Sequence, residues 1–241
     1  MTGVLTLYRS SIGKKVIMAV TGIVLVSFLV VHMYGNTKMF YGAETFNAYA
    51  AGLRDLGHPV FGYEHLLWVM RIVLVASAVG HIWSAMALTG QSQKSAYANG
   101  VGKAKRYAQK QRRTGYAAYT MRYGGIVIFL FIVYHLLHFT FGVVGYGPGR
   151  EYIAEKHGEF NAYSNVVLGF QVWPVSFFYI LAMGFLGFHL FHGIWSAFQT
   201  LGLNNEKYTS MWRGVAIVVT AIIILPNMFF PIAVMTGIVG L

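Results

Sequence analysis

Residues 171–201, QVWPVSFFYILAMGFLGFHLFHGIWSAFQTL, decide the fold of this chain. The stretch contains no Asp, Glu, Lys or Arg, yet it carries His189 and His192. A helix rises about 1.5 Å per residue, so a run of roughly 30 residues spans the ~30 Å hydrocarbon core of a bilayer. Histidine is costly at that depth unless a function requires it. The stretch therefore predicts a membrane-spanning helix whose histidines have a chemical role.

Four further apolar runs of similar length predict an integral membrane protein. The chain is 56% hydrophobic and only 10% charged, whereas soluble domains are about 25% charged. We expect an all-α bundle of five transmembrane helices in a single membrane domain over residues 1–241, with spans at about 12–35, 62–89, 121–145, 171–201 and 213–239. Pro226 and Pro231 are expected to kink the last span.

The charge distribution predicts the orientation of these spans. The N-terminal segment, the loop 90–122 and the connection 202–213 together hold thirteen Lys/Arg and one acidic residue; the opposite side holds five and six. By the positive-inside rule, the N-terminus is cytoplasmic and the C-terminus lies outside the cell (inner) membrane. The net charge of +11 is thus explained by membrane topology and not by nucleic-acid binding. Loop 90–120 is expected to be the main cytoplasmic loop, and loop 146–170 to include a short surface helix.

The chain contains no cysteine, which excludes disulfides, thiolate metal sites and cysteine-ligated iron–sulfur clusters on this chain. Any redox centre must use other ligands. Six of the nine histidines lie inside the first four spans: His32, His81, His135, His138, His189 and His192.

The depths of these histidines predict two stacked pairs. His32, 18 residues beyond Lys14, lies roughly 27 Å into the first span, near the outer face. His81 lies near the inner face, because Gly90 follows it by nine residues. An outer pair would come from the first and third spans and an inner pair from the second and fourth. Two bis-imidazole pairs in a helical bundle are the arrangement expected of two b-type haems.

Small residues one turn after the histidines, such as Gly35 after His32 and Gly193 after His189, would leave room for a flat macrocycle. They are equally typical of close helix–helix packing. The residues alone do not decide between His135 and His138. The choice between His189 and His192 also stays open, because the repeat of Ile-Trp-Ser-Ala at 82–85 and 194–197 favours His192 and the small-residue spacing favours His189.

Several motifs resemble one known family across nearly the whole chain. These are SSIGKKVIMAVTG at 10–22, FLVVHMYGN at 28–36, GAETFN at 42–47, RYGGIVIFLFIVYHLLH at 122–138 and GFHLFHGIWS at 187–196. Together they are similar to the five-helix, dihaem cytochrome b558-type membrane anchor of succinate dehydrogenase (succinate:quinone oxidoreductase) and fumarate reductase.

The resemblance implies that His32 and His135 ligate the iron of an outer haem b, and that His81 and His189 ligate that of an inner one. It implies that flavoprotein and iron–sulfur subunits dock on a cytoplasmic face formed by residues 1–14, 90–121 and 202–212. Electrons from succinate, a reaction of the tricarboxylic acid cycle, would pass through the haems to a respiratory-chain quinone, and two haems in one chain resemble the menaquinone-linked branch. Some fumarate reductases of the family have a glutamate for transmembrane proton transfer where this chain has Gly187, so that route is not expected here.

Other polar residues are candidates for supporting roles. Arg122 and Arg71 are candidate partners of haem propionates, although Arg122 also fits a membrane-boundary anchor. Ser11 and Lys15 resemble quinone-binding positions at the inner end of related anchors, and a simple helix start explains them equally well. A cluster of His58, Glu64 and His65 near the outer end of the second span is a candidate outer quinone site. The basic loop could also bind anionic membrane lipid.

The sequence contains no dicarboxylate site, flavin motif or nucleotide-binding loop. We therefore expect an enzyme subunit that acts only within a complex, as its quinone-reactive electron-transfer component. Two alternatives remain at this stage. One is a dihaem cytochrome b of another quinone-linked dehydrogenase, such as a hydrogenase or formate dehydrogenase anchor. The other is a transporter whose intramembrane histidines relay protons.

Overall fold

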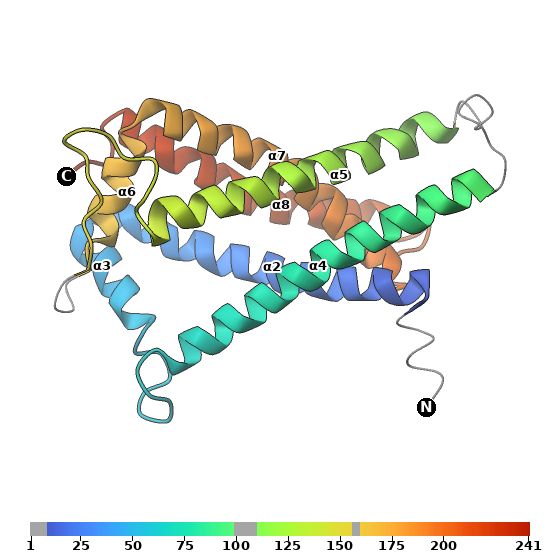
Figure 1. The fold of residues 1–241 in the computed structure, drawn as a ribbon, viewed down its shortest axis with the longest axis horizontal. Coiled ribbons are helices and arrows are strands. Elements are labelled where there is room, and N and C mark those ends of the chain that lie inside the picture. The colour runs from blue at the N-terminus through green and yellow to red at the C-terminus, as the bar shows by residue number, and fades with distance from the viewer. Residues whose placement is uncertain (1–8, 99–109, 156–159) are drawn as a thin grey trace. The chain divides into compact units, whose positions relative to one another are not determined.

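A computed structural model of the chain describes residues 9–98, 110–155 and 160–241 (Figure 1). Five long helices dominate these ranges: α2 (Ser11–Asn36), α4 (His65–Ala98), α5 (Lys110–His135), α7 (Trp173–Thr200) and α8 (Thr209–Met235). The described ranges otherwise hold short helices and one isolated bridge between Gly147 and Arg150. The expectation of an all-α fold is confirmed for this part of the chain.

Each long helix contains a segment long and apolar enough to cross a membrane. In lipid, a helix satisfies its backbone hydrogen bonds internally, and its apolar side chains can face outward. The side chains of Val75, Val79 and Met86 on α4 are 64%, 62% and 63% exposed, at spacings that put them on one helical face. A large outward-facing apolar surface of this kind fits a multi-pass membrane protein.

The helices around the basic loop are longer than the sequence predicted. Helix α4 continues to Ala98 and α5 already begins at Lys110, so residues 90–98 and 110–120 of the expected loop 90–120 are helical, and residues 99–109 lie outside the described residues. The helical parts of that segment contain no proline and are rich in Lys, Gln, Arg and Ala, all good helix formers. The prediction equated helix ends with the ends of the apolar run, whereas polar residues can continue a helix into water.

The third span ends earlier than residue 145 and ends irregularly. Helix α5 passes directly into a π-helix, η2 (Leu136–Thr140), in which Phe141 N donates to Leu136 O at 3.0 Å. The chain then turns through Gly142 and Gly145, which have φ of 66° and 83°, a backbone region that favours glycine. Segments of π-helix are rare and frequent at functional sites.

Two short helices pack together beside the long ones. Helix α3 (Ala43–Gly52) contacts α6 (Ala162–Phe170) and follows the 3-10 helix η1 (Thr37–Tyr41) (Figure 1). Tyr163 N donates to Asn47 Oδ1 at 3.0 Å, and the Tyr163 hydroxyl donates to Gly240 O at 2.8 Å. The sequence interpretation missed α3. It predicted a surface helix within 146–170, but five of the nine residues of α6 are buried, so α6 is a packed element.

Helix α8 runs through both prolines without a break. Proline removes one backbone donor from the turn before it. Near Pro226, the side-chain amide of Asn227 donates to Ile223 O at 2.6 Å.

The chain divides into two compact units. Unit 1 comprises Met1–Phe28, Val73–Gly125 and Phe188–Val218, and unit 2 comprises Leu29–Ile72, Ile126–Gly187 and Val219–Leu241. Each unit contains one of the histidine pairs described below.

Candidate functional site

The inner pair, in unit 1, consists of His81 on α4 and His189 on α7. Their ring centres are 6.2 Å apart and their ring planes meet at 61°. His81 Nδ1 lies 3.1 Å from Met18 O and 3.4 Å from Thr21 Oγ1. A carbonyl oxygen only accepts hydrogen bonds, so Nδ1 carries the proton and Nε2 has the free lone pair. Such a contact is typical of metal-ligating histidines, whose second nitrogen donates to a carbonyl or carboxylate.

Glycines on neighbouring helices leave room beside this pair. A Cβ added at Gly22 of α2 would lie 3.3 Å from His81 Cε1, and one added at Gly125 of α5 would lie 3.9 Å from His189 Cε1. The small residues that the sequence interpretation considered were different ones. A Cβ added at Gly193 would have only the tip of Met121 nearby, at 4.0 Å. A Cβ added at Gly35 would lie 2.6 Å from the ring of Tyr49, which fills that space.

The two histidines of α7 have different surroundings. His189 Nδ1 is buried and has no hydrogen-bond partner among the described residues. His192 packs on the neighbouring Phe191, with ring centres 5.2 Å apart. Of the two, His189 is therefore the one paired with His81.

The outer pair, in unit 2, consists of His32 on α2 and His135 at the end of α5. Their ring centres are 5.9 Å apart and their planes are nearly perpendicular, at 89°. His135 Nδ1 lies 3.3 Å from the hydroxyl of Tyr179 on α7. As in the inner pair, one ring has its Nδ1 hydrogen-bonded to a residue of a neighbouring helix. Nε2 is then the nitrogen of that ring that could bind a metal ion.

His138 is enclosed by protein and is less suited to bind a cofactor. Its side chain is fully buried, at 0% exposed. A Cβ added at Gly169 or at Gly145 would lie 2.5 Å or 2.8 Å from its Nε2, so backbone closes off that nitrogen. Its Nδ1 is 2.9 Å from the Tyr179 hydroxyl. Between the two candidates of the third span, the geometry favours His135.

Both pairs have the dimensions of a bis-imidazole metal site. An imidazole nitrogen binds a metal ion at about 2 Å, and the ring centre lies about 1 Å farther out, so two imidazoles on opposite sides of one ion have ring centres roughly 6 Å apart. The separations of 6.2 Å and 5.9 Å match this value. The residues therefore fit a haem iron with two axial histidines.

The two candidate propionate partners lie in different surroundings. The Arg71 guanidinium packs over the Trp68 ring, 4.8 Å from its centre, and Arg122 is exposed.

The sequence interpretation overlooked Lys14, which is only 8% exposed and donates from Nζ to Arg9 O at 2.7 Å. A buried ammonium that has one carbonyl partner among the described residues is unusual enough to mark this position, whereas in the sequence Lys14 resembled an ordinary boundary lysine.

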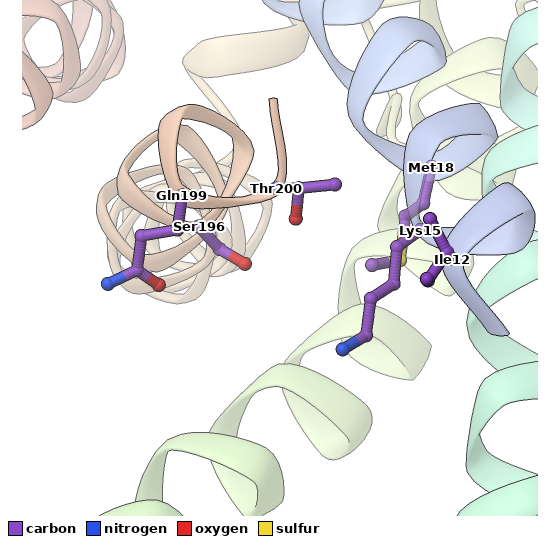
Figure 2. A pocket seen from close by; sticks show the side chains of 6 residues that line it. All are labelled: Ile12, Lys15, Met18, Ser196, Gln199 and Thr200. Atoms are coloured by element: carbon purple, nitrogen blue, oxygen red, sulfur yellow. The ribbon is translucent and has the colours of Figure 1, made fainter. Parts of the chain in front are cut away.

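A pocket of about 330 Å³ lies between the start of α2 and the end of α7, within unit 1. It is lined by Ile12, Lys15, Met18, Ser196, Gln199 and Thr200 (Figure 2). The Ser196 hydroxyl and the Thr200 side chain turn toward α2, whereas the amide of Gln199 turns away from it (Figure 2). Lys15 thus belongs to a pocket with three polar residues that the sequence interpretation missed, and Ser11 is exposed outside its lining.

In the outer cluster of His58, Glu64 and His65, the glutamate is engaged in an ion pair. Glu64 has a φ of 62° and its carboxylate pairs with Arg54 Nε at 3.0 Å. Arg54 also reaches Glu155 at 3.4 Å and packs over the Phe160 ring. These contacts tie the loop before α4 to the loop after η2.

Burial raises the pKa values of two tyrosines outside the spans, Tyr49 and Tyr146. Both hydroxyls therefore stay protonated beyond the ordinary tyrosine range. That of Tyr146 donates to Asn165 O at 3.3 Å.

The predicted docking face lies only partly within the described residues. Residues 1–8 and 99–109 are outside them, and the surface of 202–212 is described and largely exposed.

Fold and site together define a class: a helical protein with five helices long and apolar enough to cross a membrane and with two pairs of histidine rings about 6 Å apart. Comparisons with protein-family models, with curated proteins and with solved structures found no match to this chain.

Proposed function

We propose that this chain is the membrane anchor and electron-transfer subunit of a succinate:quinone oxidoreductase, with two b haems as its redox groups and a quinone, menaquinone in our proposal, as acceptor. The observation that carries the proposal is the pair of ring separations, 6.2 Å for His81 and His189 and 5.9 Å for His32 and His135. Each pair would hold one haem, and a bound haem supplies reversible one-electron transfer.

The residues around the pairs support this role. Met18 O keeps the Nδ1 proton of His81 in place, so that Nε2 remains a donor to iron. Gly22 and Gly125 leave space beside the rings. Both pairs lie on long apolar helices, and a haem edge in an apolar medium favours electron transfer over reaction with solvent.

The pocket between α2 and α7 is our candidate for an inner quinone site. Lys15, Ser196 and Thr200 supply hydrogen-bond donors beside the apolar Ile12 and Met18, a combination that suits a ring with two carbonyl oxygens and a long isoprenoid tail. The iron–sulfur and flavoprotein subunits of the proposed complex would supply the electrons from the cytoplasmic side.

The proposal is tested by the haem content of single-histidine variants. The purified chain should contain two b haems. His81→Ala or His189→Ala should remove one of them, and His32→Ala or His135→Ala the other, because each loses one axial ligand. The matched control is His192→Ala, which changes the neighbouring histidine of α7 and should retain both haems. Pyridine haemochrome spectra give the number of haems per chain.

The outcomes separate the alternatives. A purified chain without a b-type spectrum would exclude every cytochrome function and leave the transporter. If haem is present, succinate added to membranes that contain the complex should reduce it. Reduction by hydrogen or formate, with no response to succinate, would instead indicate an anchor of another quinone-linked dehydrogenase.

A further inference from the structure

Tyr179 lies between two histidines of unit 2 and is hydrogen-bonded to both. Its hydroxyl oxygen is 3.3 Å from His135 Nδ1 and 2.9 Å from His138 Nδ1. The side chain is only 5% exposed, and its ring is held edge-to-face by Phe131 and Phe170, with centres 5.1 Å and 5.0 Å away. The hydroxyl is therefore fixed in place.

The number of protons determines the direction of these hydrogen bonds. A tyrosine hydroxyl has one proton and can donate it to only one of the two nitrogens. If His135 binds iron through Nε2, its Nδ1 carries a proton and must donate it to the Tyr179 oxygen. The Tyr179 proton then goes to His138 Nδ1, which is the closer acceptor. Hydrogen bonds in such a chain polarise and strengthen one another.

His138 is well placed to orient this chain. It is fully buried between the backbones of Gly145 and Gly169, and the Phe139 ring stacks on it at 4.0 Å. The imidazole has no space in which to turn. In the tautomer that carries its proton on Nε2, its Nδ1 is a fixed acceptor that directs the Tyr179 hydroxyl and turns the oxygen lone pairs toward His135.

We propose that Tyr179 is a positioning residue for the outer haem ligand: it accepts the His135 Nδ1 proton in a hydrogen bond, with His138 orienting the hydroxyl. This inference rests on the proposed function. A hydrogen bond from Nδ1 makes the imidazole more basic and a stronger donor to the metal, which stabilises the oxidised iron. Tyr179 therefore lowers the reduction potential of the outer haem, and hydrogen bonding of this kind is one of the means by which proteins tune such potentials.

The test is a redox titration of both haems in the complete purified complex carrying Tyr179→Phe. The phenyl ring keeps the packing and removes the hydroxyl. We expect both haems to be retained, the potential of the outer haem to shift to a more positive value, and that of the inner haem to stay unchanged. The low-spin electron paramagnetic resonance signal of the outer haem should shift as well, because its ligand field weakens.

Tyr134→Phe is the matched control. The Tyr134 ring also packs near Tyr179, with centres 6.2 Å apart, but its hydroxyl is not hydrogen-bonded to His135. This variant should leave both potentials unchanged. An equal shift in Tyr134→Phe, or an unshifted outer haem in Tyr179→Phe, would overturn the inference while leaving the proposed function intact.

If Tyr179→Phe fails to assemble, variants of His138 test whether the hydrogen bond of Tyr179 affects the potential of the outer haem. His138→Asn offers Oδ1 near the position of Nδ1 and should keep the wild-type outer potential. His138→Leu removes the acceptor and should shift that potential in the same direction as Tyr179→Phe, by a smaller amount. No shift in His138→Leu would overturn the orienting role. A wild-type chain without b haem would overturn this inference and the proposed function together.

Discussion

At the scale of single residues, His138 shows how glycine creates space for a buried side chain. Gly145 and Gly169 approach its ring from two sides. Gly145 also needs its positive φ of 83°, so both backbone conformation and space restrict that position. Gly169 lies in the helix α6, where the backbone conformation suits any residue, so only the lack of space for a Cβ restricts that position.

We predict that Gly169→Ala destabilises the protein by about 1–3 kcal/mol, the range typical of an overpacked core. The added Cβ would lie 2.5 Å from His138 Nε2, and the fully buried imidazole cannot move away. The measurement is the thermal unfolding midpoint of the purified protein in detergent.

Gly184→Ala is the control for this substitution. Gly184 also lies inside a helix, α7, and a Cβ there would have no neighbour within 4 Å. Alanine should be neutral there or stabilise by up to ~1 kcal/mol, because glycine loses more backbone entropy on folding. Equal midpoints for the two variants would contradict the tight packing of His138.

The choice between histidines also belongs to this scale. The sequence placed His135 and His138 at similar depth and left the choice between them open. The ring pair of His135 with His32 and the enclosure of His138 by Gly145 and Gly169 distinguish them. Neither follows from local spacing, because both depend on residues that are distant in the sequence.

At the scale of elements, helix α6 holds the preceding loop through one side chain. Asn165 Oδ1 accepts from Ile153 N at 2.7 Å, and Asn165 Nδ2 donates to Ile153 O at 2.8 Å. Asn165 is 5% exposed. The pair of bonds resembles a short piece of β-ladder made by a side chain, and it satisfies both backbone groups of Ile153.

We predict that Asn165→Ala lowers the unfolding free energy by roughly 1–3 kcal/mol, because two hydrogen bonds to the Ile153 backbone are lost. Limited proteolysis should then cut the chain near Ile153 faster than in the wild type. Asn161→Ala is the control, since Asn161 precedes α6 without a side-chain capping bond and should have little effect. A loop as resistant in Asn165→Ala as in the wild type would contradict the anchoring role.

The elements also show what the sequence could predict. Five apolar runs were sufficient to locate the five long helices, because a backbone in lipid has few alternatives. The helix ends near residues 98 and 110 were missed because polar residues continue those helices beyond the apolar run. Helix α3 was missed because its order depends on distant partners: Tyr49 fits beside Gly35, and Asn47 accepts from Tyr163.

At the scale of the whole molecule, the two histidine pairs occur in different compact units. His81 and His189 lie in unit 1, and His32 and His135 lie in unit 2. The predicted pairing of helices by depth therefore corresponds to one histidine pair in each unit. Each pair would supply both ligands of its own haem, so we expect each haem to be lost independently.

The orientation of the molecule is the last prediction, and the absence of cysteine makes it directly measurable. The excess of Lys/Arg around 90–122 and 202–213 predicts, by the positive-inside rule, that these segments lie in the cytoplasm. Glu206 is exposed in the second of these segments. Val60 is 83% exposed. It lies just before the first residue of α4, whereas the basic segment 90–122 begins near the last residues of that helix. A single cysteine at either position would report the side of the membrane on which it lies.

We predict that Val60→Cys reacts with a membrane-impermeant maleimide in intact cells or spheroplasts. Glu206→Cys should react only after permeabilisation. The cysteine-free wild type is the control for background labelling, and detergent-solubilised samples control for the accessibility of each thiol. The reverse pattern would invert the topology. It would then put residues 202–212 outside the cell, where cytoplasmic iron–sulfur and flavoprotein subunits could not dock on them, and the proposed complex would have to be abandoned.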